Sequence, residues 1–118
     1  MACKALTEHT LPKEELDADL AGAQKIGDSA VGQKALYLPG RLLARARYVP
    51  LAALERAYLR LVVGEKRHGN FQQPLLVLKI DGKEQVYLYT QEKTVRDILA
   101  ALEEKGIAIG KPAAPKPN

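Results

Sequence analysis

The stretch "QPLLVLKIDGKEQVYLYT", residues 73–90, constrains the fold more than any other part of the chain. Two runs with strand-forming composition flank Asp81 and Gly82, a pair that tolerates the positive φ angles of a type I′ turn. A two-residue loop fixes the register of the two strands. The expected cross-strand pairs are Lys79 with Glu84, Val77 with Val86, and Leu75 with Leu88. The sequence therefore predicts a β-hairpin whose apolar ladder ends in an opposite-charge pair.

A helix is predicted directly after this hairpin, in "TQEKTVRDILAALEEKGIAIG", residues 90–110. Its apolar stripe follows the i, i+3, i+4, i+7 pattern and consists of Val95, Ile98, Leu99 and Leu102. Thr90 is the expected N-cap. Gly106 stands where a left-handed residue ends a helix, which would place Ile107 against Leu102 as in a Schellman motif.

A second helix is predicted near the start of the chain, where Leu16, Leu20 and Ala23 form a thin apolar stripe behind Pro12. Residues 1–10 are expected to be flexible. The end of the chain, residues 111–118, holds three prolines and no large apolar side chain, so it is expected to be a disordered tail. Residues 11–110 then form a single domain.

The location of the protein follows from what the sequence lacks. The start, "MACKALTEHT", has no apolar core of a signal peptide, and no run of about 18 apolar residues could span a bilayer. Cys3 is the only cysteine, which excludes an intrachain disulfide. A cytoplasmic protein is expected.

Two segments between the helices are harder to assign. "QKALYLPGRLLARARYV" is expected to form two strands about a turn at Pro39 and Gly40. "PLAALERAYLRLVVG", residues 50–64, fits an amphipathic helix behind Pro50 and also alternates as a strand would. Periodicity alone leaves both alternatives open.

The order of these segments is similar to that of small bacterial proteins of the pleckstrin-homology-like (PH-like) superfold. The resemblance spans residues 30–110 and rests on "ALYLPGRLLARARYVPLAALERAYLRL", then "LLVLKIDGKEQVYLY", then "TVRDILAALEEKGIAIG". It implies an α+β fold: a bent antiparallel sheet of about five to seven strands closed by the C-terminal helix, with the N-terminal helix added. It also implies that residues 53–63 are a strand in which Arg56, Tyr58 and Arg60 share a face.

The chain departs from this pattern in its number of strands. A full PH-like barrel has seven strands, whereas about five can be placed in this sequence. Either further strands lie in "KIGDSAVGQ" and "GEKRHGNF", or the sheet is open and has an edge that needs a partner.

Arginine is concentrated in the middle of the chain, because six of the seven arginines lie within residues 40–70. Guanidinium groups two residues apart on a strand project from one side and could grip phosphates or carboxylates. The candidate anion-binding residues are Lys34, Arg45, Arg47, Arg56 and Arg60. Pairing of these arginines within the chain, with Glu55 or Glu84, is the alternative that we favour.

The sequence shows no catalytic apparatus. His68 is accompanied by no nucleophile motif, phosphate loop or HExxH pair, so an enzyme is not expected. No cofactor is indicated. Cys3 and His9 supply two metal ligands where zinc usually takes four, so no metal is expected.

Nucleic acid is a disfavoured partner. The net charge of +4 is a mild bias, and the tyrosines available for stacking come with no RNP1, helix-turn-helix or zinc-finger pattern.

These observations predict a non-catalytic interaction module that binds a protein partner or a second copy of itself, for example through a sheet edge. The alternative is a binder of an anionic ligand, a membrane surface or nucleic acid through an arginine-rich sheet face. The two differ in their response to salt, because binding driven by ion pairs weakens as salt rises.

Overall fold

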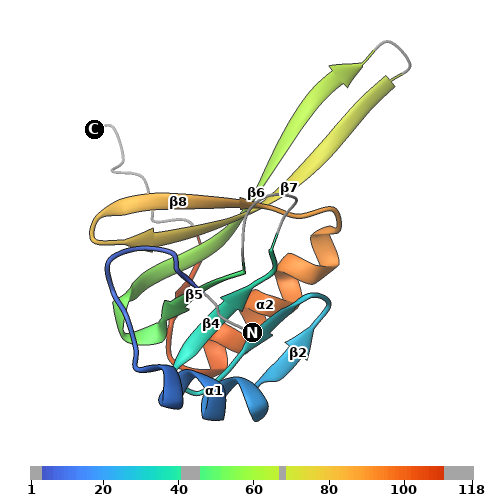
Figure 1. The fold of residues 1–118 in the computed structure, drawn as a ribbon. Helices are drawn as coiled ribbons and strands as arrows, with labels where there is room; N and C mark the ends of the chain where they lie inside the picture. Colours follow the sequence, from blue (N-terminus) through green and yellow to red (C-terminus); the bar gives the residue numbers. More distant parts are fainter. Residues whose placement is uncertain (1–3, 41–45, 67–68, 111–118) are drawn as a thin grey trace.

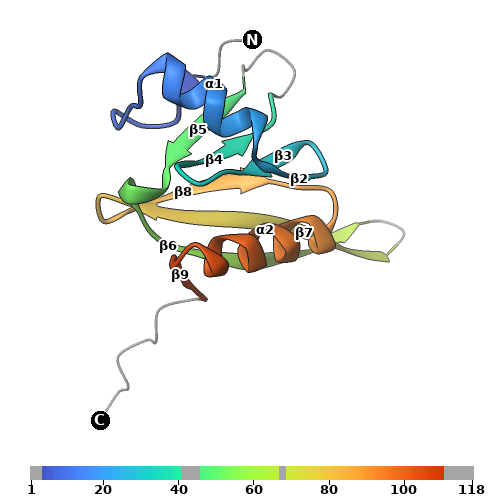
Figure 2. The ribbon, with the colours of Figure 1, turned by 90° about the horizontal axis from the view of Figure 1, so that it is seen from below.

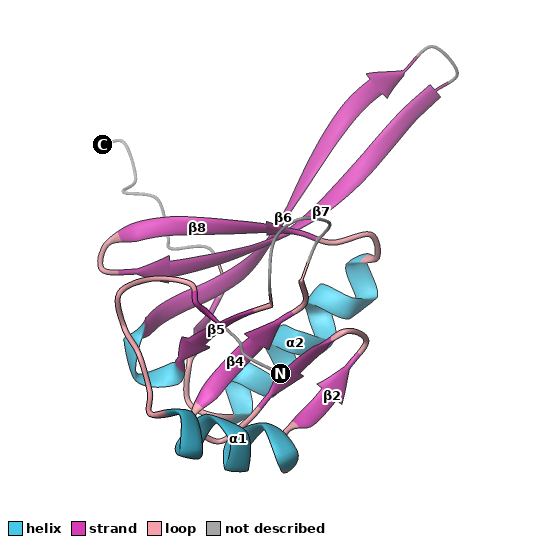
Figure 3. Cartoon of the chain, viewed as in Figure 1, coloured by secondary structure: helices cyan, strands magenta, loops and turns pink. Residues whose placement is uncertain are grey.

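The computed structural model describes residues 4–40, 46–66 and 69–110. In this part of the chain, two α-helices and nine strands form an α+β fold with two mixed sheets (Figures 1 and 3). The expected α+β class is confirmed. Arg45, His68, Cys3 and the expected tail at residues 111–118 lie outside the described residues.

The first sheet has the strand order β1-β5-β4-β3-β2. Its strands are β1 (Lys4–Ala5), β2 (Gln24–Ile26), β3 (Ser29–Val31), β4 (Ala35–Leu38) and β5 (Arg47–Pro50). All neighbours are antiparallel except β1 and β5, which are parallel. β4 and β5 are the two strands expected about Pro39 and Gly40. β2 and β3 correspond to one of the two alternatives left open above, in which further strands lie in "KIGDSAVGQ". β1 was not predicted, and it lies inside the segment expected to be flexible.

The second sheet has the order β8-β7-β6-β9. Its strands are β6 (Leu54–Lys66), β7 (Gly69–Ile80), β8 (Lys83–Leu88) and β9 (Ala108–Ile109), which is parallel to β6. Residues 53–63 are therefore essentially strand, as the family resemblance implied, after a short 3-10 turn at Leu51–Ala53. The predicted single antiparallel sheet is wrong: two sheets are present, and no described ladder joins them.

One apolar core holds the two sheets together. It lies between the inner faces of the sheets and α2 (Glu92–Glu104), which packs along them (Figure 2). Its fully buried residues come from all three elements and include Leu36, Leu38, Val49, Leu76, Leu78, Val95, Ile98 and Leu102. The apolar stripe of α2 is thus buried as expected.

The local signals around the second hairpin and α2 are largely confirmed. Asp81 and Gly82 have φ angles of 55° and 77°, and the register of β7 and β8 is the predicted one. Ile107 N donates to Leu102 O at 3.1 Å behind Gly106, whose φ is 87°, which completes the Schellman ending. The predicted N-cap at Thr90 is wrong, because Gln91 occupies that position and makes no side-chain cap.

The N-terminal helix α1 (Lys13–Ala21) lies on the other face of the first sheet and buries none of its residues (Figure 2). Asp19 holds it there. The Asp19 carboxylate accepts hydrogen bonds from the backbone N–H groups of residues 33, 34 and 35, at 2.8, 3.1 and 3.2 Å, and from Tyr37 Oη at 2.8 Å. A Cβ at Gly32 would lie 2.1 Å from Asp19 Oδ2, so only glycine permits this approach.

We expect Asp19→Ala to lower the free energy of unfolding by about 2 to 4 kcal/mol, because it leaves four donors, two of them partly buried, without an acceptor. Urea unfolding measures the loss. Asp17→Ala is the matched control, since the exposed Asp17 lies on the same helix, and it should change stability by less than about 0.5 kcal/mol. Equal effects of the two substitutions would show that Asp19 does not anchor α1.

Candidate functional site

The predicted anion-binding residues do not gather at one place. Lys34 lies in the turn between β3 and β4, where its Nζ pairs with Glu15 Oε1 at 2.8 Å. Arg47 lies in the first sheet, opposite Leu38 of β4. Arg56 and Arg60 lie together on β6 of the second sheet. Arg45 is outside the described residues, so anion binding through this whole set stays a prediction.

A β-bulge at Glu55 decides which side chains of β6 face outward. The ladder shifts between Leu54 and Arg56, so Leu54 packs in the core while Arg56, two residues later, faces outward. The bulged Glu55 also accepts a hydrogen bond from Gly82 N at 2.8 Å, which ties β6 to the turn between β7 and β8. Beyond the bulge, successive residues alternate between the core and the opposite surface.

We call that opposite surface the outer face. Strand alternation and the registers of β6, β7 and β8 assign its members: Arg56, Tyr58, Arg60, Val62, Gln73, Leu75, Val77, Lys79, Glu84, Val86 and Leu88. The implied common face for Arg56, Tyr58 and Arg60 follows from this register.

A compact polar cluster occupies the outer face around Tyr58. Arg60 Nη2 donates to Tyr58 Oη at 2.8 Å and to Glu84 Oε1 at 3.2 Å, and Tyr58 Oη donates to the Glu84 carboxylate. The Arg60 guanidinium also lies 5.6 Å from the centre of the Tyr58 ring. The favoured pairing of these arginines with Glu84 is thus confirmed for Arg60.

Arg56 is satisfied by the backbone. Its Nη1 donates to Gly110 O at 2.9 Å and to Ile109 O at 3.4 Å, at the end of β9. Both arginines of β6 therefore hold the sheet together, β6 to β8 through Arg60 and β6 to β9 through Arg56. Each guanidinium therefore already uses some of its N–H donors within the chain, and fewer remain for an external anion.

The surroundings of Tyr58 raise its pKa above the ordinary value. Burial disfavours the charged phenolate, and the hydrogen bond to Glu84 holds the proton further, against the opposing effect of Arg60. The pKa of Arg60 is raised as well, first by its hydrogen bond to Glu84. The cluster is therefore built for a protonated tyrosine.

Next to this cluster the outer face is apolar and open. Val62, Val86 and Leu88 are 43%, 48% and 54% exposed, whereas Tyr58, Leu75 and Val77 between them are buried. The solvated face of an antiparallel sheet usually carries polar residues. These large apolar side chains, which come from two strands, therefore form an unusual exposed patch. Sequence reasoning noticed the apolar residues on both sides of this hairpin but missed that Val86 and Leu88 stay about half exposed.

The hairpin of β6 and β7 continues past the rest of the sheet as an arm, residues 61–66 and 69–74 (Figure 1). The ladder is unbroken from Leu61 opposite Pro74 to Lys66 opposite Gly69. Leu61, at the base of the arm and on the other side from Val62, is 38% exposed. A ribbon of two strands is marginally stable alone in water, so such an arm gains from contact with a further surface.

The described residues contain no group of three or more His, Cys, Asp or Glu residues that could hold a metal ion. His9, one of the two residues weighed and rejected as metal ligands, contacts Asp81, with Nε2 and Oδ2 2.7 Å apart. Neither helix in this part of the chain has the length and apolar character needed to cross a membrane.

Comparison with protein-family models, with curated proteins and with solved structures gave no match to this chain.

The raised pKa of Tyr58 makes stability depend on pH in the alkaline range. Folding favours the protonated phenol, so this contribution is fully present below the unfolded pKa of about 10 and is lost as pH rises above it. We expect the free energy of unfolding in urea to fall as pH rises above about 10, and to fall less in Tyr58→Phe. An unchanged decrease in Tyr58→Phe would contradict the assignment.

Proposed function

We propose that this protein is a non-catalytic interaction module of the PH-like type that associates with a second copy of itself through the outer face and the arm. The observation that carries the proposal is the exposure of Val62, Val86 and Leu88 on one sheet face beside a projecting two-stranded arm. Burial of such residues contributes about 25 cal/mol for each Å² of apolar surface removed from water.

The order of elements supports the PH-like part of the proposal. Four strands, β2 to β5, follow one another as antiparallel neighbours in the first sheet. Three more, β6 to β8, do so in the second sheet, and a helix follows them. This is the segment order on which the resemblance was based, with seven meander strands in place of the five first assigned.

Hydrogen bonding within the chain favours a second copy over an anionic partner. The outer face carries three cations; Arg56 and Arg60 make hydrogen bonds within the chain, whereas Lys79 makes no ion pair with a described residue. Glu84 lies on the same face, so Arg60 of one copy can meet Glu84 of another without leaving a charge unpaired. A two-fold contact requires a patch that complements itself. An apolar patch beside the Arg60–Glu84 pair meets this requirement.

The test is the oligomeric state in solution. We expect the wild-type protein to be a dimer at micromolar concentration by sedimentation equilibrium, and Val86→Lys with Leu88→Lys to be a monomer that stays folded, because both side chains are already half exposed. Gln24→Lys with Ala100→Lys adds the same charge at exposed positions outside the outer face and should stay dimeric.

Salt separates this proposal from its alternative. A dimer held by apolar contacts should persist when salt is raised, whereas ion-driven association should weaken. A wild-type monomer at all concentrations would overturn the proposal. A wild-type monomer retained on heparin or on anionic vesicles at physiological salt would in addition favour the anion-binding alternative.

A further inference from the structure

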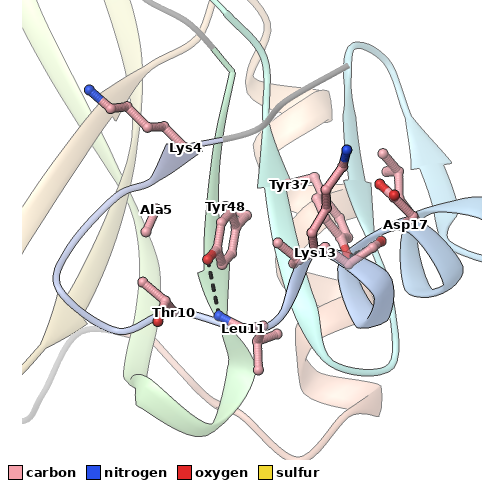
Figure 4. A pocket seen from close by; sticks show the side chains of 10 residues that line it. Lys4, Ala5, Thr10, Leu11, Lys13, Asp17, Tyr37 and Tyr48 are labelled. Atoms are coloured by element: carbon pink, nitrogen blue, oxygen red, sulfur yellow. Dashed lines mark hydrogen bonds between the residues drawn. The ribbon is translucent and has the colours of Figure 1, made fainter.

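A cavity of about 310 Å³ lies beneath α1, on the side of the first sheet away from the core (Figure 4). The segment that includes Ala5, Thr10 and Leu11 forms one wall, and Leu16 and Leu20 of α1 form another. The volume is at the lower end of the range of about 300 to 1,000 Å³ for small-molecule sites. The cavity involves a different sheet from the outer face.

The floor of the cavity is aromatic. Tyr37 of β4 and Tyr48 of β5 lie directly opposite each other in the ladder, so their rings stand side by side on one face of the sheet. Each is 4% exposed. Because so little of either ring is exposed, a hydrocarbon group in the cavity would contact mainly Leu11, Leu16 and Leu20, which are only partly buried, with the two tyrosines beneath it.

The helix above the floor is incompletely packed. The apolar side chains of α1 that face the sheet, Leu16 and Leu20, are only half buried. α1 contains no buried residue at all; Leu16 and Leu20 pack against the sheet, and the hydrogen bonds of Asp19 and the Lys34–Glu15 pair add to this contact. A guest in the cavity would supply the contacts that this helix lacks.

Two donors on the wall have no acceptor in the described part of the chain. Tyr48 Oη accepts the hydrogen bond of Leu11 N at 3.0 Å, drawn in Figure 4, and its own proton is left to donate. The Lys13 side chain runs beside Tyr37 in Figure 4, and its ammonium makes no ion pair with a described residue. Tyr37 differs, because its hydroxyl donates to Asp19.

From these observations we propose that the cavity beneath α1 binds a small apolar carboxylic acid. The hydrocarbon body packs among Leu11, Leu16 and Leu20 above the two tyrosines, and the carboxylate accepts from Tyr48 Oη or pairs with Lys13. The acid carries one charge only, because Asp17 also stands at the rim and would repel a second. Lys4 contributes its stem, since its ammonium points away from the cavity in Figure 4.

Titration of the full chain with sodium benzoate, followed by NMR of backbone amides and tyrosine rings, tests the proposal. We expect saturable shifts at Leu11, Lys13, Tyr37 and Tyr48, with contacts between the benzoate ring protons and both tyrosine rings. Benzyl alcohol, which keeps the ring and lacks the charge, should bind more weakly. Shifts confined to other residues would overturn the site. Equal affinity for benzyl alcohol would overturn the assignment of an acid as the ligand.

Three variants distinguish binding in the cavity from nonspecific binding to the protein surface. Lys13→Gln should weaken benzoate binding about two- to five-fold and leave benzyl alcohol binding unchanged, as expected for an exposed ion pair. Lys25→Gln, at an exposed position of β2, should change neither. Ala5→Phe should fill the cavity and abolish binding of both probes. If this variant does not fold, the ring contacts in the wild-type protein still decide the matter, since their absence at saturation overturns the proposal.

Discussion

The packing of the α2 stripe against two sheets is the interaction on which the rest of the structure depends. No described ladder joins the sheets, so they are joined by their common core with α2 and by side-chain hydrogen bonds such as that of Tyr87 Oη to Pro39 O. Val95, Ile98 and Leu102 are fully buried there, and the Schellman ending turns the chain so that β9 can pair with β6. The outer face and the α1 cavity lie on the sides of the two sheets that face away from this core.

Prediction succeeded where the signal was local. A two-residue turn at Asp81 and Gly82 fixes its own register, and the stripe of α2 with Gly106 fixes where the helix ends, so neither needs information from elsewhere in the chain. The two-residue β1 could not be found in this way. A strand so short has no periodicity, and its pairing with β5 across more than forty residues is decided by tertiary contacts.

The candidate surface was only partly accessible to sequence reasoning. Strand alternation and the pairing with Glu84 could be anticipated for Arg60, because both residues belong to predicted strands. The partners of Arg56 could not be anticipated, because they are backbone carbonyls beyond α2 and no side-chain pattern encodes them. The bulge at Glu55 was also hidden, although it reassigns Leu54 to the core. The network of Asp19 likewise joins a helix to a turn that no motif connects.

The two proposed surfaces should act independently of each other. Coupling requires an element with two arrangements whose equilibrium both sites bias. The cavity is bounded by α1, which buries no side chain, whereas the outer face rests on strands packed against α2. The route between them runs through the close-packed core, where Leu36 and Leu76 are fully buried and neither sheet has room to shift. A guest beneath α1 would therefore stabilise that helix and leave the association of the outer face unchanged.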